Sequence, residues 1–239
     1  MNRIVFGTHH RCGTNLLYGT LDTFSNILNK QFTVDYLDDT SFDINHFYKS
    51  DIALSDHGRF YRFDSDQWVF VNIIRDPRDV VLSGADYHSR DVVPEDWLLK
   101  ARMGDRTYHE YLREVDYHER VLREANAVGR DTCIEMVESF NYKNVITIKY
   151  EDLINLSDTK TSVNRIASAC DMSVRESVVF LGSLLRHHPI VGTPNKPEHL
   201  TSTGAAERWR SSDPNLICEI ESILRDYIKI LGYKLSSNL

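Results

Sequence analysis

The stretch that decides the fold is residues 4–17, IVFGTHHRCGTNLL. Its apolar start, Ile4–Phe6, predicts a buried strand, and the polar loop that follows ends at Gly13. Apolar residues then recur at helical spacing from Leu16, which predicts a helix over about residues 14–29. A strand, a glycine-bounded loop and a helix point several backbone N–H groups and the positive end of the helix dipole at one spot. The sequence therefore predicts an anion-binding loop.

This loop is not a Walker A loop. That motif, G-x-x-x-x-G-K-[ST], has a lysine directly after its second glycine, followed by a hydroxyl residue that holds magnesium. Here Thr14 follows Gly13 directly, and the cation of the loop, Arg11, comes two residues before the glycine. Taken alone, the stretch also fits an ordinary strand-to-helix turn of polar sequence, so the rest of the chain must decide.

Length and charge limit the possible functions. The chain has 239 residues, with 41% hydrophobic and 26% charged residues, which is ordinary for a globular protein and favours one domain, 1–239, over two small ones. The formal net charge of -7 argues against a general nucleic-acid-binding role. An anion must therefore be held by local geometry and a few arginines.

The cysteines and apolar runs indicate a location. Four scattered cysteines form no C-x-x-C pair, so we expect neither a zinc site nor a disulfide framework. We find no signal peptide and no apolar run long enough to span a membrane. We expect a cytoplasmic protein with reduced thiols, no membrane association and no metal site.

Strands and helices are predicted to alternate along the chain. Predicted strands cover residues 31–37, 51–55, 68–74 and 144–150 after the first one. Predicted helices lie within 85–130, ending at Gly129, and over about 131–141, 159–170, 173–186 and 214–231, with a long loop over 187–213. This alternation is typical of an α/β fold, a doubly wound parallel sheet flanked by helices, and the continuous apolar run 68–74 suits its middle.

Such a sheet would gather four segments at one rim. Ligands of doubly wound sheets bind beyond the carboxyl ends of the strands. That rule brings together the 7–15 loop, His57, Arg75 and Tyr150-Glu151, each of which follows a predicted strand.

A second motif identifies the type of anion. Residues 75–83, RDPRDVVLS, follow the most strand-like run of the chain. Together with residues 8–14, THHRCGT, they resemble the sulfotransferases that use 3′-phosphoadenylyl sulfate (PAPS), a family with a P-loop-containing nucleotide-binding fold. The resemblance implies that the first loop cradles the 5′-phosphosulfate. It also implies that Arg75 and Ser83, which keep the family's eight-residue offset, bind the 3′-phosphate.

Two later segments extend the resemblance to nearly the whole chain. Residues 149–153, KYEDL, are similar to a family segment whose tyrosine, here Tyr150, lies near the adenine. Residues 202–209, STGAAERW, match a late family element at Gly204 and Trp209 only.

The chain also departs from the family pattern. Ser202 and Thr203 stand where the family has an arginine and a lysine, so either Lys196, Arg208 or Arg210 replaces them or the site is weaker. The family's tryptophan after the first loop is Leu16 here, so adenine stacking must come from elsewhere.

The resemblance implies a set of cofactor-binding residues for PAPS and its product PAP. They are His10, Arg11, Cys12, Gly13, Thr14, Asn15, Arg75, Ser83, Tyr150 and Gly204. We interpret Cys12 as a backbone N–H donor rather than a nucleophile. The resemblance also implies a catalytic role for Arg11, whose fixed cation would stabilise the charge that develops on the transferring group.

His57, in the segment Ser55-Asp56-His57-Gly58, is the candidate general base. It ends a predicted strand in the region where many family members carry a catalytic histidine, and histidine suits proton removal at neutral pH. The rival histidines are His9, His10, His88, His187 and His188, which we expect to be structural or solvent-facing, although the first two lie beside the loop.

We therefore predict a PAPS-dependent sulfotransferase that transfers a sulfuryl group in line to a hydroxyl or amine of a small molecule or glycan. The alternatives are a P-loop nucleotide or small-molecule kinase, which the missing G-K-[ST] argues against, and a non-catalytic PAP-binding or scaffold module. Neither the acceptor's identity nor the oligomeric state can be predicted.

Overall fold

The computed structural model describes residues 2–35, 49–90, 95–194 and 206–236. They fall into two compact units. The sheet unit comprises Met1–Arg75 and Glu135–Ala206, and the helical unit comprises Asp76–Ile134 and Glu207–Leu239.

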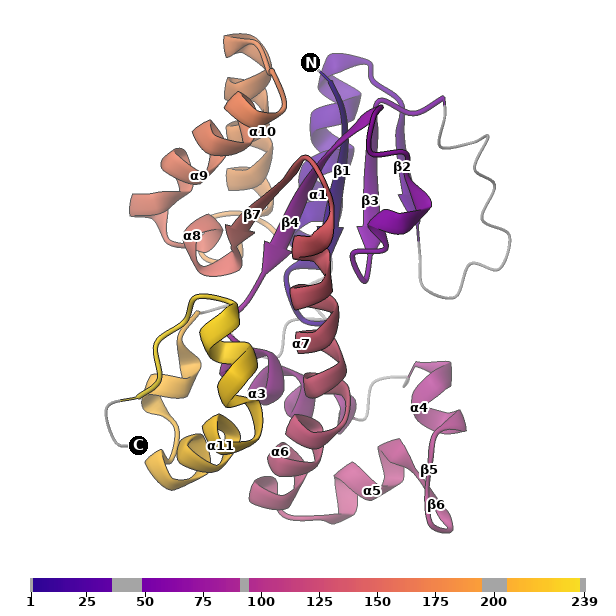
Figure 1. Cartoon of the computed structure of the whole chain (residues 1–239), viewed down its shortest axis with the longest axis vertical. Coiled ribbons are helices and arrows are strands. Elements are labelled where there is room, and N and C mark those ends of the chain that lie inside the picture. The colour runs from indigo at the N-terminus through magenta and orange to yellow at the C-terminus, as the bar shows by residue number, and fades with distance from the viewer. Residues whose placement is uncertain (1, 36–48, 91–94, 195–205, 237–239) are drawn as a thin grey trace. The chain divides into compact units, whose positions relative to one another are not determined.

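The sheet unit is built on five parallel strands in the order β2-β3-β1-β4-β7 (Figure 1). Their bounds are β1 Arg3–Thr8, β2 Phe32–Asp35, β3 Ile52–Asp56, β4 Trp68–Ile74 and β7 Val145–Lys149. The predicted parallel α/β sheet is confirmed, and β4, the most apolar strand, is hydrogen-bonded on both sides as predicted. Because the strands are parallel, their carboxyl ends share one rim.

Successive residues of each strand pack into different cores. Ile4 and Phe6 join Ile52 and Leu54 of β3 in the larger core, whereas Val5 points to the other face, into the smaller core. This follows from the period of two in an extended chain.

Helices cover the face of the larger core. They are α1 Thr14–Leu28, α8 Tyr150–Ile154, α9 Leu156–Ala169 and α10 Val174–His187. The prediction of α9 and α10 is confirmed, whereas α8, a single short helix after β7, was missed. On this face Phe6 stacks on Phe180 of α10 at 5.6 Å between ring centroids, and Phe24 of α1 meets the same ring edge-on at 5.4 Å. Two short 3₁₀ turns, η1 Phe60–Arg62 and η2 Ser139–Asn141, lie beside the smaller core.

The helical unit is organised around three helices that pack on one another: α3 Pro77–His88, α6 Tyr117–Asn126 and α11 Pro214–Ile230. It also contains α4 Asp96–Lys100, α5 Tyr108–Glu114 and the turn η4 Arg208–Ser211. Asp79 of α3 accepts hydrogen bonds from the backbone amides of Glu207 and Trp209 at 2.6 and 3.1 Å. The Trp209 ring lies 3.5 Å from the Arg78 guanidinium, so the tryptophan anchors this turn.

Two predictions in the stretch 85–138 are wrong. A small antiparallel hairpin, β5 Arg102–Met103 and β6 Arg106–Thr107, interrupts the stretch that was predicted to be helical, and Gly104 takes the left-handed turn with φ +63°. Gly129 does not end a helix but lies in the first turn of α7, Val128–Glu138. A Cβ there would lie 2.7 Å from Val81 of α3, so this glycine serves close helix packing instead.

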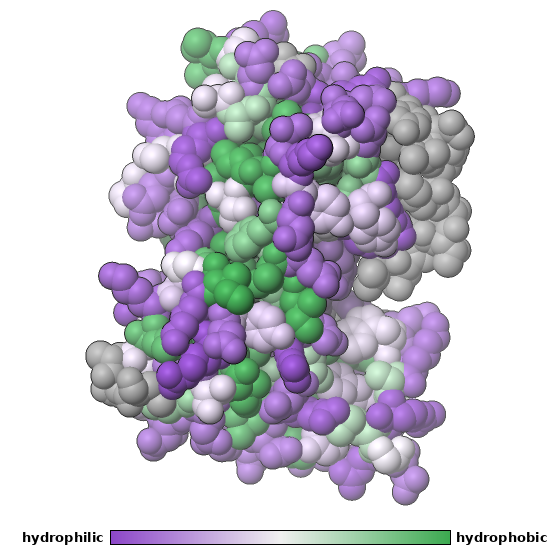
Figure 2. All heavy atoms as spheres, viewed as in Figure 1, coloured by the Kyte–Doolittle hydropathy of each residue, from purple (hydrophilic) through white to green (hydrophobic). Residues whose placement is uncertain are grey.

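The mean hydropathy of the chain is -0.38. On the face drawn in Figure 2, purple hydrophilic residues dominate and green apolar ones are interspersed among them. Within the described ranges, none of the helices combines the length and the apolar character that crossing a bilayer requires.

Candidate active site at the carboxyl ends of the strands

The loop after β1 has the backbone that its glycine was expected to provide. Gly13 caps α1 in the left-handed region, at φ +97°. A Cβ at this position would lie 2.8 Å from the ring of Tyr150, so a side chain is excluded by space as well as by backbone conformation. Thr14 opens α1, and the first-turn amides of a helix have no acceptor within it. The loop therefore presents donors to an anion.

Cys12 differs in part from its interpretation. Its backbone N–H donates to the carbonyl of His9 at 2.9 Å, so this amide closes the turn of the loop instead of facing outward. Its side chain is fully buried, with Sγ 3.8 Å from Sδ of Met136. The N–H donors for an anion are accordingly those that begin α1.

Arg75 connects the loop to the end of β4. Its Nη1 donates to the backbone carbonyl of Arg11 at 2.8 Å, and its guanidinium lies 4.7 Å from the centroid of the Tyr150 ring. Arg75 is 6% exposed and Tyr150 is 5% exposed. Tyr150, which follows β7, in turn packs against Gly13. Three predicted cofactor-binding positions on three different strand ends thus meet at one place.

Arg11 itself has a left-handed backbone, at φ +59°. A non-glycine residue pays about 1–2 kcal/mol for that conformation, so the surrounding contacts must hold it. The Arg75 bond to its carbonyl is one such contact. Thr8 and Thr14 provide another across the loop, with their hydroxyl oxygens 2.9 Å apart.

His57 lies at the end of β3, and its imidazole contacts a carboxylate. Its Nδ1 is 3.0 and 2.9 Å from the two carboxylate oxygens of Glu135, on the last part of α7. Burial alone would lower the pKa of His57, but the Glu135 hydrogen bond and the charges of Asp56 and Glu135 hold it above its ordinary value. The ring of His10 is stacked at 6.3 Å from the His57 ring.

Hydrogen bonds and an ion pair stabilise the backbone turn that carries His57. His57 has φ +64°, and the next residue, Gly58, has φ +56°. Ser55 accepts a hydrogen bond from the Arg59 backbone amide at 3.0 Å and donates to Asp35 of β2 at 3.2 Å. Arg59 also pairs with the Asp35 carboxylate at 3.2 Å. These contacts fix a backbone that would otherwise relax.

Gly58 leads to a testable prediction about stability. A Cβ on Gly58 would lie 2.5 Å from Cε1 of His9, whose ring is fully buried, and the backbone is left-handed. We expect Gly58→Ala to lower the free energy of unfolding by about 2 kcal/mol or more. Urea denaturation followed by circular dichroism measures it.

Gly182 provides the matched control. It lies inside α10, where nothing is within 4 Å of the added Cβ. Gly182→Ala should stabilise the protein by about 0.5–1 kcal/mol. Equal effects of the two substitutions would contradict the close approach of Gly58 to His9.

Four of the five rival histidines have partners that the structure shows. His9 is buried, with Nε2 2.9 Å from Oδ1 of Asn72. His88 pairs with Glu124 at 3.1 Å inside the helical unit. His187 bonds the Thr23 hydroxyl at 2.8 Å, and His188 bonds the carbonyl of Ile154 at 3.1 Å.

The geometry of the sheet unit does not test the binding roles of two predicted cofactor residues, Ser83 and Gly204. Ser83 is a buried residue of α3, 2% exposed, and belongs to the helical unit. Gly204, like Ser202, Thr203 and Lys196, lies outside the described residues. The binding roles of Ser83 and Gly204 stay predictions.

Glu135 is the site residue that sequence reasoning missed. It lies 78 positions after His57, on a helix whose neighbouring residues Cys133 and Met136 are buried. In the sequence it is one of many acidic residues, and helical periodicity alone does not say which partner a carboxylate meets. Its place between the apolar residues Ile134 and Met136 was the one available signal.

Comparison with known proteins places the fold. No protein-family model matches the sequence, and no curated protein matches it either. Among solved structures, mouse sulfotransferase SULT7A1 complexed with PAP is similar, with a TM-score of 0.61, 16% identity and coverage of 95% of this chain and 85% of that one. Retinol dehydratase in complex with androsterone and the inactive cofactor PAP is also similar, with a TM-score of 0.51, 17% identity and coverage of 100% and 84%. The chain thus has the P-loop-type α/β fold of PAPS-dependent sulfotransferases.

Proposed function

We propose that this protein is a PAPS-dependent sulfotransferase, which moves a sulfuryl group from PAPS to a hydroxyl or amine of an acceptor. One observation supports this most strongly: Arg75 donates to the Arg11 carbonyl at 2.8 Å while lying 4.7 Å from the Tyr150 ring. Arg75, the first residue of the second motif, thus contacts the first motif within the sheet unit. An anion loop and a second, separate arginine suit a nucleotide with phosphate at both ends of its ribose.

Different residues of the sheet unit are proposed to bind different parts of PAPS, the sulfuryl donor. The amides of Gly13, Thr14 and Asn15 at the start of α1 would bind the 5′-phosphosulfate, where the helix dipole favours negative charge. Arg75 would bind the 3′-phosphate, and Tyr150 would lie beside the adenine. His10 stays in the proposed set beside this loop, and Ser83 and Gly204 keep the roles that the resemblance implies.

The proposed reaction is a direct displacement at sulfur. The acceptor oxygen attacks the sulfur in line, the new O–S bond forms, and the S–O bond to the 5′-phosphate of PAP breaks. His57 accepts the proton that the acceptor hydroxyl loses. Arg11 and the loop amides stabilise the negative charge on the sulfuryl and leaving oxygens, so the protein contributes positioning and electrostatics.

The proposed acceptor is a small molecule or a glycan. Retinol dehydratase, one of the structural neighbours, was crystallised with androsterone, a small molecule, besides PAP. The segments around residues 38–50, 85–125 and 187–203 vary in composition and are proposed to select the acceptor. Aromatic residues and charges of both signs occur in them, which leaves sugars, phenols, lipids and peptides as acceptors to be tested.

Sulfuryl transfer tests the proposal directly. PAPS labelled with sulfur-35 is incubated with the full chain and a panel of phenols, sterols, oligosaccharides and amines, in EDTA. Labelled product that accumulates together with PAP is the expected result. Magnesium-dependent phosphorylation from ATP without any sulfuryl transfer would instead support the kinase reading, and PAP binding without transfer would support the scaffold reading.

A further inference from the structure

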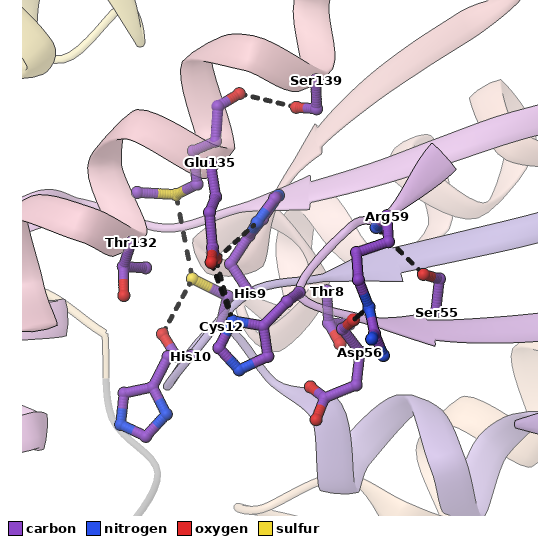
Figure 3. Close-up of polar contacts among 12 residues, drawn as sticks. Thr8, His9, His10, Cys12, Ser55, Asp56, Arg59, Thr132, Glu135 and Ser139 are labelled. Carbon is purple, nitrogen blue, oxygen red and sulfur yellow. Dashed lines mark hydrogen bonds and ion pairs between the residues drawn. The ribbon is translucent and has the colours of Figure 1, made fainter. Parts of the chain in front are cut away.

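Glu135 lies between two histidines of the strand ends. Its carboxylate oxygens are 2.9 and 3.0 Å from Nδ1 of His57. One of them is 3.7 Å from Nδ1 of His9, and both of these residues, Glu135 and His9, are labelled in Figure 3. The first separation is a hydrogen bond, and the second is an ion-pair distance too long for one. Glu135 therefore bonds His57 and only neighbours His9.

The hydrogen-bond chain behind His9 assigns the protons of that ring. The Ser139 hydroxyl donates to the carbonyl of Met136 at 2.6 Å, so its oxygen accepts from Nδ2 of Asn72 at 2.5 Å. The amide of Asn72 is thereby oriented with Oδ1 toward Nε2 of His9, 2.9 Å away. Since an amide oxygen only accepts, Nε2 of His9 carries a hydrogen.

The same reasoning assigns the proton of His57. A carboxylate only accepts hydrogen bonds, so Nδ1 of His57 carries the hydrogen and Nε2 carries the lone pair in the neutral ring. Glu135 is ionised under ordinary conditions: burial would raise its pKa, but the hydrogen bond to His57 and the electrostatic attraction of the nearby His57 and His9 rings outweigh burial and lower the pKa to about 2.

We propose that Glu135 is the positioning residue for His57, an inference that rests on the proposed function. Its carboxylate holds the Nδ1–H, directs the basic Nε2 to the acceptor hydroxyl, and stabilises the imidazolium that forms once the proton has moved. It is not itself the base, because both of its oxygens already face the His57 ring. The His9, Asn72 and Ser139 chain fixes the neighbouring ring, so His9 does not compete for the carboxylate.

The groups that face His57 determine the sign of the pH effect. Glu135 from α7 and Asp56 from β3 are negative, whereas Arg59 after β3 is positive, and His10 stacks at 6.3 Å. The two carboxylates hold the pKa of His57 above 6.5. A base must be neutral to accept a proton, so activity rises as the pH increases through that raised pKa. Removing the charge of Glu135 should move this rise to lower pH and make the base weaker.

Glu135→Gln keeps the size of the side chain and removes its charge. Glu138→Gln, on the exposed face of the same helix, is the matched control. The first readout needs no substrate: long-range ¹H–¹⁵N spectra of the imidazoles in the full chain, with His57 assigned through His57→Ala. In the parent and in Glu138→Gln, neutral His57 should carry its hydrogen on Nδ1. In Glu135→Gln the pKa of His57 should fall below 6.5, with both tautomers present.

The second readout is sulfuryl transfer from labelled PAPS to the best acceptor of the panel. In Glu135→Gln, kcat should fall by about 10- to 100-fold, whereas the affinity for PAP should change less than about twofold. The acid limb of the pH profile, which is the rise of kcat with increasing pH, should move to lower pH. Glu135→Asp, which restores the charge, should recover part of kcat and most of the His57 pKa. If circular dichroism shows that Glu135→Gln does not fold, Glu135→Asp still tests the inference.

An unchanged His57 pKa and tautomer in Glu135→Gln overturns the inference, and so does an unchanged acid limb. If the parent chain fails to bind PAP, the proposed function fails while the spectra still decide whether Glu135 controls the His57 ring. The two failures are therefore distinguishable.

Discussion

His57→Ala should lower kcat for sulfuryl transfer by about 10²- to 10⁴-fold, the range over which positioned bases contribute. The acceptor hydroxyl is a weak nucleophile while it keeps its proton, and His57 is the histidine at the strand ends that bonds a charged carboxylate. The affinity for PAP should change less than about twofold, because the donor is held by the loop and Arg75. Transfer from labelled PAPS measures kcat, and calorimetry measures PAP binding.

The control for this variant is His118→Ala. His118 is 48% exposed in its side chain and bonds Glu219 in the helical unit, at 2.9 Å. Its removal should leave kcat and PAP affinity unchanged. If His57→Ala kept turnover within about threefold of the parent, general-base catalysis by this histidine would be ruled out.

Arg75→Ala should weaken PAP binding by about 100-fold or more, since charged hydrogen bonds to phosphate contribute about 1.5–3 kcal/mol each. AMP lacks the 3′-phosphate, so its affinity should change far less, and the ratio of the two affinities should fall toward one. Arg75→Lys should be intermediate, because an ammonium keeps the charge but not the planar fork of donors. Calorimetric titration of each variant with both nucleotides provides the ratio.

Arg75 could also act structurally, by supporting the loop, and the same titrations distinguish this role from binding of the 3′-phosphate. Its bond to the Arg11 carbonyl and its stacking on Tyr150 brace the loop. Equal losses for PAP and AMP in Arg75→Ala would mean that the arginine supports the loop and does not bind the 3′-phosphate. Arg165→Ala, an exposed arginine that donates to the carbonyl of Thr147, should change neither affinity.

The sheet could be predicted because each of its strands is either an apolar run or an alternation of apolar and polar residues. The stretch 68–74 coincides with β4, and the segment from Thr14 forms α1 almost to the residue. Once the strands are parallel, their carboxyl ends share a rim, so the meeting of Gly13, Arg75 and Tyr150 followed from topology.

What sequence reasoning missed depends on contacts between distant residues. The Glu135 partnership with His57 requires α7 to run past the end of β3, and no local pattern encodes this. Gly129 was mistaken for a helix end because its reason is a close approach to Val81. The β5–β6 hairpin was hidden inside a polar stretch, although Gly104-Asp105 was a turn signal between its two short strands.

The most direct test of the central claim is calorimetric titration of the full chain with PAP, AMP and ATP-Mg²⁺. A site built to hold phosphate at both the 5′ and the 3′ position should bind PAP at least about 100-fold more tightly than AMP, and without magnesium. Tighter binding of ATP-Mg²⁺ than of PAP, or equal affinity for PAP and AMP, would contradict a PAPS site.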